Sequence, residues 1–157
     1  MVYREVGWAL ACLIQGGSAP QQAQAQAVVI FVCDHGSSKS VVAASHFNRL
    51  AQAQGLSIRA IARGVIPEPE IPSPVRRGLA KDGITVGPFA PQPILPQDFR
   101  SGARVIALGC ALRLVAPKGA AYDTWTDLPD LSDGYPPARA ALVGRIRKLI
   151  GSMAPSH

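Results

Sequence analysis

Short apolar runs alternate with amphipathic segments along most of this chain. Three runs have the length and the β-branched content of buried strands, at 28–33, 56–65 and 104–110. Apolar residues recur at helical spacing in three further segments, at 41–53, 75–81 and 138–150. Strands that alternate with helices form parallel sheets, because a parallel crossover leaves room for a helix. The pattern therefore predicts an α/β domain with an open parallel sheet and helices on both faces.

Proline-rich stretches interrupt this pattern at 66–74 and 88–96. No helix can run through them, because proline fixes φ and lacks an N–H. They are predicted to be surface loops. Residues 97–99 can open a short helical turn, and Pro136 and Pro137 suit the first turn of the last helix.

The first apolar run ends at Cys33, where a small polar loop leads into a helix. The loop consists of Asp34, His35, Gly36, Ser37 and Ser38, and Lys39 and Ser40 follow it. Backbone N–H groups of such a loop and of a helix N-terminus bind phosphate-like anions. This surrounding favours the thiolate form of a cysteine, which is the nucleophilic form. The stretch therefore predicts attack by a thiolate on a bound tetrahedral oxyanion.

This stretch resembles the low-molecular-weight protein-tyrosine phosphatases and the related thioredoxin-coupled arsenate reductases. Their signature is a strand that ends in C-x5-R-S before a helix, and this chain has C-x5-K-S from Cys33 to Ser40. The resemblance implies the flavodoxin-like phosphotyrosine phosphatase I fold, an open parallel four-stranded sheet with helices on both faces and ligands bound at the carboxyl ends of the strands. It implies that Cys33 is the nucleophile, that Lys39 stands in place of the anion clamp and that Ser40 stabilises the thiolate. Residues 34–38 would bind the oxyanion, and no metal or organic cofactor would take part.

Two departures from the family pattern concern this anion site. Arginine grips two oxygens of a tetrahedral anion with a planar fork, whereas Lys39 is a rotating point charge that holds the anion's geometry less well. The loop also carries Asp34-His35-Gly36 where family members often have Gly-Asn, and histidine tolerates a positive φ less well. Arg63, at the end of the second predicted strand, is a candidate for partly replacing the missing arginine. The alternative for Arg63 is an exposed basic side chain.

Cys110 ends its predicted strand as Cys33 does. In the arsenate reductases a second cysteine stands at the corresponding position and a third follows, and together they relay oxidation out of the site. Residues 111–119 contain no cysteine, so the complete relay is absent. A two-cysteine variant and a disulfide between Cys33 and Cys110 that shuts the site both stay open. A purely structural role for Cys110, as a small buried residue, is the third interpretation.

The segment 122–131 carries the candidates for a general acid. The family places an aspartate, usually followed by proline, on a late loop, and the arsenate-reductase-like members often have Trp and then Leu-Pro-Asp-Pro. Leu128-Pro129-Asp130 fits that pattern, with Leu131 in place of the last proline. Asp130 is therefore the first candidate for protonating the leaving oxygen, and Asp127 the second. The alternative is that both aspartates are turn residues, which aspartate favours.

Composition limits the partners of this 157-residue chain. Its length supports one domain, and its net charge of +6 favours anionic ligands. The basic residues are scattered rather than blocked, so nucleic acid is not expected. The expected partners are a phosphate- or arsenate-like oxyanion and a phosphotyrosine protein, and the protein is expected to be a monomer or a weak dimer.

The N-terminus has features of a targeting segment. A short apolar stretch precedes two A-x-A cleavage patterns that end at Ala25 and Ala27, which is typical of a signal peptide. Residues 1–27 are thus predicted to be a signal peptide or a disordered extension, 28–151 the domain and 152–157 a disordered tail. A real signal peptide would make the protein periplasmic or secreted, and otherwise it would be cytoplasmic. The apolar stretch is shorter than the roughly 20 residues of a membrane span, so no stable membrane anchor is expected.

Three functional hypotheses follow. The first is a phosphatase-like protein that hydrolyses phosphate monoesters through a cysteinyl-phosphate intermediate and is impaired by Lys39. The second is an arsenate-reductase-like thiol oxidoreductase that uses Cys33 and Cys110. The third is a non-catalytic domain that binds an oxyanion or a partner and has lost the clamp.

Overall fold

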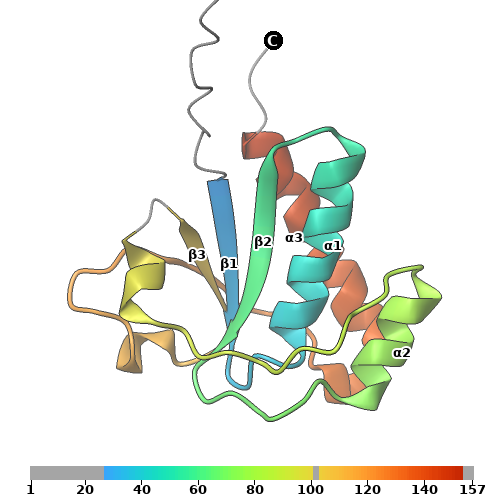
Figure 1. Cartoon of the computed structure of the whole chain (residues 1–157), viewed down its shortest axis with the longest axis horizontal. Coiled ribbons are helices and arrows are strands. Elements are labelled where there is room, and N and C mark those ends of the chain that lie inside the picture. Colours follow the sequence, from blue (N-terminus) through green and yellow to red (C-terminus); the bar gives the residue numbers. More distant parts are fainter. Residues whose placement is uncertain (1–26, 101–102, 154–157) are drawn as a thin grey trace, which may run out of the picture.

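A four-stranded parallel sheet forms the centre of the protein (Figure 1). The computed structural model describes residues 27–100 and 103–153. The strands follow the spatial order β2-β1-β3-β4. Their bounds are β1 (Ala27–Cys33), β2 (Ile58–Gly64), β3 (Arg104–Leu108) and β4 (Asp123–Trp125). β1 lies between β2 and β3, so both of its edges are paired, and a core cluster packs on each face. Its residues from Val29 to Cys33 are therefore buried.

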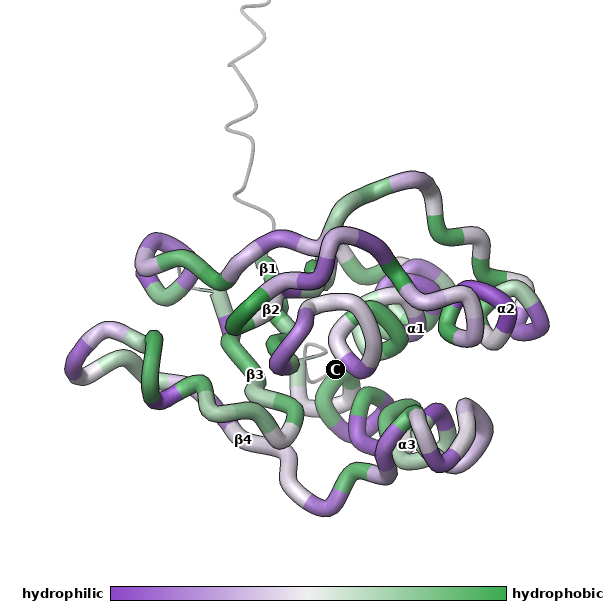
Figure 2. Tube along the Cα trace, turned by 90° about the horizontal axis from the view of Figure 1, so that it is seen from below, coloured by the Kyte–Doolittle hydropathy of each residue, from purple (hydrophilic) through white to green (hydrophobic). Residues whose placement is uncertain are grey.

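Three α-helices cover one face of the sheet (Figures 1 and 2). They are α1 (Lys39–Ala53), α2 (Ser73–Lys81) and α3 (Tyr135–Met153). Their apolar sides and alternate residues of β1 and β3 form the larger core cluster. Phe31 stands at its centre, with ring centroids 6.0 Å from Phe47 and 5.6 Å from Trp125. This core fixes α1 against the end of β1, where the cysteine loop begins.

The opposite face carries short 3-10 turns instead of long helices. These are η1 (Pro96–Phe99) and η2 (Leu112–Leu114), which with adjoining loops cover a smaller cluster around Ile30, Val32 and Val105. The prolines of 88–96 explain the difference, since they prevent a longer helix in the connection that crosses this face. A third such turn, η3 (Leu131–Asp133), precedes α3.

The predicted fold class is confirmed, and the differences lie in the details. The helical cover expected on both faces is unequal, with all three α-helices on one face. β4 lies in a segment for which the sequence predicted only a loop. α3 extends to Met153, so the first two residues of the predicted tail 152–157 are helical. Residues 154–157, and all but Ala27 of the predicted N-terminal segment 1–27, lie outside the described residues.

No α-helix within residues 27–100 and 103–153 is both long enough and apolar enough to cross a membrane.

Candidate active site

Cys33 closes β1 at the carboxyl edge of the sheet, at the floor of the loop that leads into α1. The residue is 3% exposed, and its Sγ lies 3.1 Å from the buried hydroxyl of Ser40 in the first turn of α1. This hydroxyl can donate to a thiolate at that distance. The structure therefore brings Ser40 to the sulfur, as the resemblance implied.

A glycine pair and an adjoining segment hold the loop in shape. Gly36 has φ +65°, and a Cβ there would stand 2.8 Å from the backbone nitrogen of Gly64 at the end of β2. The carbonyl groups of residues 33–35 accept hydrogen bonds from the segment that follows β2. The backbone N–H groups of Val65, Ile66 and Glu68 donate to the carbonyls of residues 33, 34 and 35, at 3.1, 2.8 and 3.0 Å respectively. The positive φ therefore falls on Gly36, and not on the neighbouring His35.

The backbone N–H groups of the loop are available to bind a ligand. In the described part of the chain, no backbone hydrogen bond is donated by the N–H groups of residues 35–41. Several of these groups belong to the N-terminus of the 15-residue helix α1, whose dipole favours negative charge there. Donors gathered around a buried sulfur suit a tetrahedral oxyanion.

Lys39 faces the predicted general acid across the mouth of the loop. Its Nζ lies 3.6 Å from Asp130 Oδ2, and the Asp130 side chain is 62% exposed. The Ser132 N–H donates to Asp130 Oδ1 at 3.2 Å, and this hydrogen bond together with the Lys39 charge lowers the pKa of Asp130. The second candidate, Asp127, has φ 56° and accepts a hydrogen bond from Thr126 Oγ1. The structure thus brings Asp130, and not Asp127, into an ion pair with Lys39.

Glu68 is the contributor to this loop that sequence reasoning missed. Its Oε2 accepts a hydrogen bond of 2.5 Å from Ser37 Oγ, and Ser37 is fully buried. Its Oε1 lies 3.7 Å from His35 Nδ1. The carboxyl group is therefore fixed against the loop. Only its place in a polar, proline-rich loop distinguished Glu68 in the sequence, and that is too general a signal to have identified it.

Cys110 lies just after β3, the strand that pairs with β1. Its Sγ donates to the carbonyl of Val32 at 3.4 Å, and both Cys33 and Cys110 are free thiols. Burial raises the pKa of Cys110, and the negative charges of Asp34 and Cys33 raise it further. The second cysteine therefore lies beside the loop as an uncharged thiol.

Arg63 does not take the place of the missing arginine. Its side chain is 22% exposed, and its Nε donates to Asp98 Oδ2 in η1 at 3.2 Å. The suggestion that Arg63 leans toward the anion site is therefore wrong, and the alternative of an exposed side chain is also wrong. The carboxylate of Asp98 holds the guanidinium in a partly buried ion pair.

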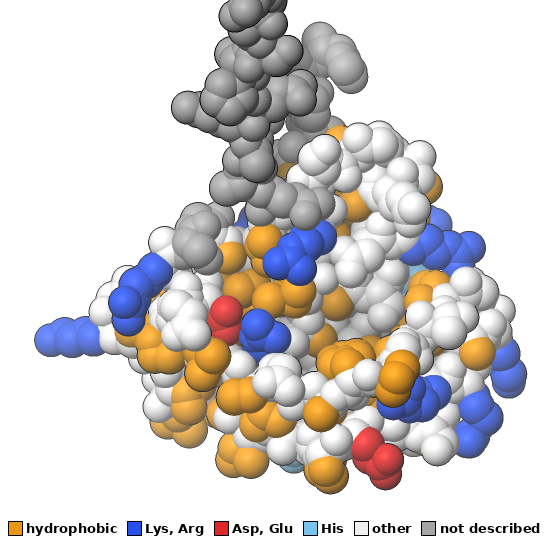
Figure 3. All heavy atoms as spheres, in the orientation of Figure 1, with side chains coloured by type: hydrophobic (Ala, Val, Ile, Leu, Met, Phe, Trp, Pro, Cys, Tyr) orange, Lys and Arg blue, Asp and Glu red, His pale blue; other side chains and the backbone are white. Residues whose placement is uncertain are grey.

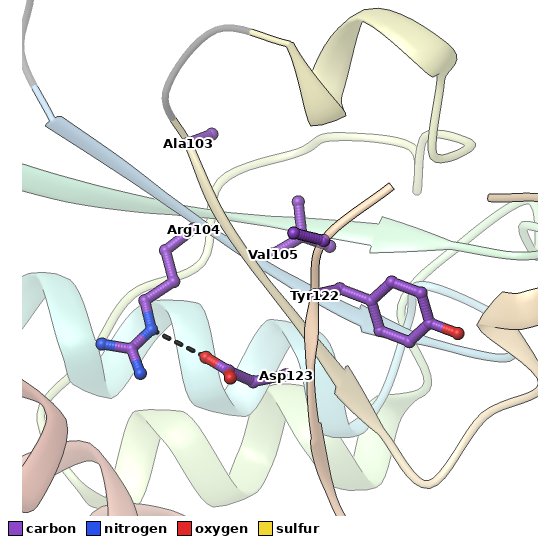
Figure 4. Close-up of a pocket in the computed structure, with 6 residues that line it drawn as sticks. Ala103, Arg104, Val105, Tyr122 and Asp123 are labelled. Atoms are coloured by element: carbon purple, nitrogen blue, oxygen red, sulfur yellow. Dashed lines mark hydrogen bonds and ion pairs between the residues drawn. The ribbon is translucent and has the colours of Figure 1, made fainter. Parts of the chain in front are cut away.

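The hollow drawn in Figure 4 lies at the other end of the sheet. It has a volume of about 320 Å³ and opens beside the start of β3, where Arg104 Nε donates to Asp123 Oδ2 at 2.8 Å. Cys33, in contrast, follows the ends of the strands. The hollow is therefore separate from the cysteine loop.

Within residues 27–100 and 103–153, no group of three or more His, Cys, Asp and Glu side chains could hold a metal ion.

Similarity to known proteins appears in structure and not in sequence. No protein-family model and no curated protein matches the chain. The thioredoxin-dependent arsenate reductase of Corynebacterium glutamicum is 25% identical, with a TM-score of 0.66 over 83% of this chain, which spans 63% of that protein. A low-molecular-weight protein tyrosine phosphatase from T. tengcongensis is also 25% identical, with a TM-score of 0.70 over 80% of this chain and 99% of its own. An arsenate reductase in the phosphate-binding state shares the fold at 21% identity, with a TM-score of 0.66 over 82% and 99% of the two chains.

Both of the 25% identical structures belong to proteins of the kind that the cysteine loop resembles. The agreement covers 83% and 80% of this chain rather than a single motif. These likenesses place the chain, as a phosphatase-like protein, in the structural superfamily of the low-molecular-weight protein-tyrosine phosphatases and the thioredoxin-dependent arsenate reductases.

Proposed function

We propose that the protein hydrolyses phosphate monoesters, including phosphotyrosine-type esters, with Cys33 as the nucleophile. The observation that carries this proposal is the buried Cys33 sulfur, 3.1 Å from Ser40 Oγ, beneath backbone N–H groups that have no acceptor in the described residues. Hydrogen-bond donors around an anion-binding site stabilise the charge that develops on the phosphoryl oxygens during transfer.

The reaction has two balanced steps. The Cys33 thiolate attacks phosphorus, the bond from phosphorus to the ester oxygen breaks, and Asp130 gives its proton to the leaving oxygen. Water then attacks the cysteinyl phosphate, Asp130 takes up a proton, and inorganic phosphate and the thiolate are released. The ammonium group of Lys39 attracts the substrate anion. The anion therefore competes with Asp130 for the ion pair with Lys39.

The pKa of Asp130 sets the pH dependence of this scheme. The Ser132 N–H and Lys39 hold the pKa of Asp130 below its ordinary value, so the acid form is scarce at neutral pH. The protonated fraction grows as pH falls toward that pKa. Acid catalysis by Asp130 is therefore expected to be faster at mildly acidic pH than at pH 8.

The test is hydrolysis of an aryl phosphate by the purified chain in the presence of a thiol reductant. We expect turnover that Cys33→Ser abolishes and that the matched variant Cys110→Ser retains. Mass spectrometry of the quenched reaction should show one phosphoryl group on Cys33. A rate that is equal in wild type and Cys33→Ser would contradict the proposal.

A second candidate function rests on the position of Cys110 next to the loop. An arsenate-reductase-like reaction would transfer two electrons from Cys33 and Cys110 to a bound arsenate, giving arsenite and a disulfide that an external dithiol must reduce. The Cys110 thiol at the end of β3, beside β1, favours this candidate. Cys110→Ser separates the two functions, because it would stop arsenate reduction and leave aryl phosphate hydrolysis. A folded protein with neither activity would favour the third hypothesis, a non-catalytic oxyanion-binding domain.

A further inference from the structure

Three contacts fix Glu68 on the cysteine loop. Its backbone N–H donates to the carbonyl of His35 at 3.0 Å, Ser37 Oγ donates to its Oε2 at 2.5 Å, and its Oε1 lies 3.7 Å from His35 Nδ1. Because Ser37 is fully buried and the backbone is paired, the carboxylate has little freedom to move away from the loop. The carboxylate of Glu68 is thus held against the loop that is proposed to bind the phosphate.

A second carboxylate of the loop adds to this charge. Asp34, directly after Cys33, is exposed and pairs with no Lys or Arg among the described residues. Three carboxylates elsewhere in the molecule are neutralised by ion pairs with arginines: Asp82, Asp98 and Asp123.

Basic side chains outnumber acidic ones and give the chain its net charge of +6. On the face drawn in Figure 3 they are spread out, on both sides of the molecule and in its middle. The net charge of the protein therefore favours anions, and at the loop the carboxylates of Glu68 and Asp34 oppose the attraction that Lys39 provides.

We infer that Glu68 determines specificity and makes the site prefer phosphate monoesters that carry a cationic group next to the phosphate, such as phosphopeptides with flanking Arg or Lys. This inference rests on the proposed function. A phosphate dianion in the loop is repelled by the fixed carboxylate, which weakens its binding. A cation on the substrate within reach of Glu68 offsets that repulsion and gains attraction from the exposed Asp34. An acidic flank adds repulsion instead.

The chain offers a matched control two residues away. Glu70 is exposed in the same loop and makes no hydrogen bond or ion pair in the described structure. Its charge is surrounded by solvent and free to move, so it interacts weakly with a bound substrate. Glu68→Gln and Glu70→Gln remove the same charge from the same segment and differ in whether that charge is fixed against the loop.

The experiment compares kcat/KM for two phosphotyrosine peptides that differ only in their flanks, Arg and Lys in one and Asp and Glu in the other. At low ionic strength we expect wild type to prefer the basic peptide about tenfold and Glu68→Gln only about threefold, while Glu70→Gln stays within twofold of wild type. For an aryl phosphate whose ring carries no charged group, Glu68→Gln should lower KM about threefold and change kcat less than twofold. The peptide preference should shrink at 0.5 M salt, where screening shortens the reach of charges.

Two outcomes would overturn the inference: a preference in Glu68→Gln equal to that of wild type, or an equal loss on both peptides, which would mean a purely structural role. Failure of the proposed function is recognised separately, by the absence of aryl phosphate hydrolysis in wild type. In that case, the charge preference of the site is tested by calorimetric measurement of the binding of both peptides to the Cys33→Ser chain. Tighter binding of the basic peptide would support the inference without catalysis, and equal or absent binding would overturn it.

Discussion

Lys39 is the residue at which this protein departs most from the family it resembles. It opens α1 directly above the loop, but its ammonium group is 3.6 Å from Asp130 and makes one ion pair there. A lysine presents a single charge without a fixed direction, whereas an arginine at the first turn of a helix could donate two parallel hydrogen bonds to an oxyanion. The structure thus provides attraction for the anion and leaves its orientation to the backbone N–H groups.

Lys39→Arg is therefore expected to raise kcat/KM for an aryl phosphate by about tenfold or more. A charge-assisted hydrogen bond contributes about 1.5–3 kcal/mol, which corresponds to roughly 10- to 150-fold. Steady-state kinetics with Lys81→Arg as the remote control would measure this. An unchanged rate in Lys39→Arg would show that the lysine does not limit catalysis.

At the level of elements, what could be predicted depended on whether a signal was local. Cys33, Lys39 and Ser40 follow one another at the junction of β1 and α1, so a strand-to-helix pattern was sufficient to bring them together. Asp130 lies far along the chain from Cys33, so only the family pattern predicted it as part of the site. Glu68 and the Arg63–Asp98 pair depend on which loop side chains meet in space, and no periodicity encodes that.

β4 was missed for a related reason. It has three residues, two of them exposed, and its burial pattern does not alternate clearly. Its place at the edge of the sheet is set by pairing with β3, where Ile106 is opposite Asp123 and Leu108 is opposite Trp125. Tertiary context decides such a short edge strand, and propensity over a few residues cannot.

The contact of α2 with α3 gives a prediction at the same scale. A Cβ on Gly78 in α2 would overlap the ring of Tyr135, so Gly78→Ala should destabilise the protein by about 1–2 kcal/mol although alanine is the better helix former. Gly144 in α3 has no atom near its missing Cβ, and Gly144→Ala should instead stabilise by about 0.5–1 kcal/mol. Urea unfolding measures both. Stabilisation by Gly78→Ala would mean that Tyr135 moves aside without cost.

At the scale of the whole molecule, one polar cluster joins all three α-helices. Asp82, which ends α2, accepts hydrogen bonds from Tyr135 and Arg139 of α3, each 2.7 Å long. His46 of α1 completes it, with its Nε2 3.2 Å from Asp82 Oδ2 and 3.3 Å from the Tyr135 hydroxyl. Arg49 donates to the Asp82 carbonyl as well. The helices that cover the sheet are thus tied together by groups whose charges depend on pH.

Burial lowers the pKa of His46, with further lowering by Arg139 and Arg49, and the attraction of Asp82 offsets this only in part. For Asp82, burial alone would raise the pKa, but the hydrogen bonds from Tyr135 and Arg139 outweigh it and lower the pKa, so this carboxylate stays ionised in mild acid. The folded protein therefore holds His46 neutral in a range where the unfolded chain, with an ordinary histidine pKa near 6.5, takes up a proton. Since the unfolded state binds more protons there, stability must fall as pH drops through about 6.5.

We expect the urea midpoint of wild type to be lower at pH 5.5 than at pH 7.5, and His46→Gln to lose most of this difference because glutamine does not titrate. His35→Gln is the matched control, since His35 is exposed on the cysteine loop and outside this cluster. An equal pH dependence in wild type and His46→Gln would assign the effect to another group. A loss in His46→Gln alone would show that the attachment of α1 to α2 and α3, and with it the support of the cysteine loop by α1, weakens in mild acid. Lowering the pH would then have two opposite effects on activity. It would protonate Asp130, which favours acid catalysis, and it would destabilise the fold that positions Asp130.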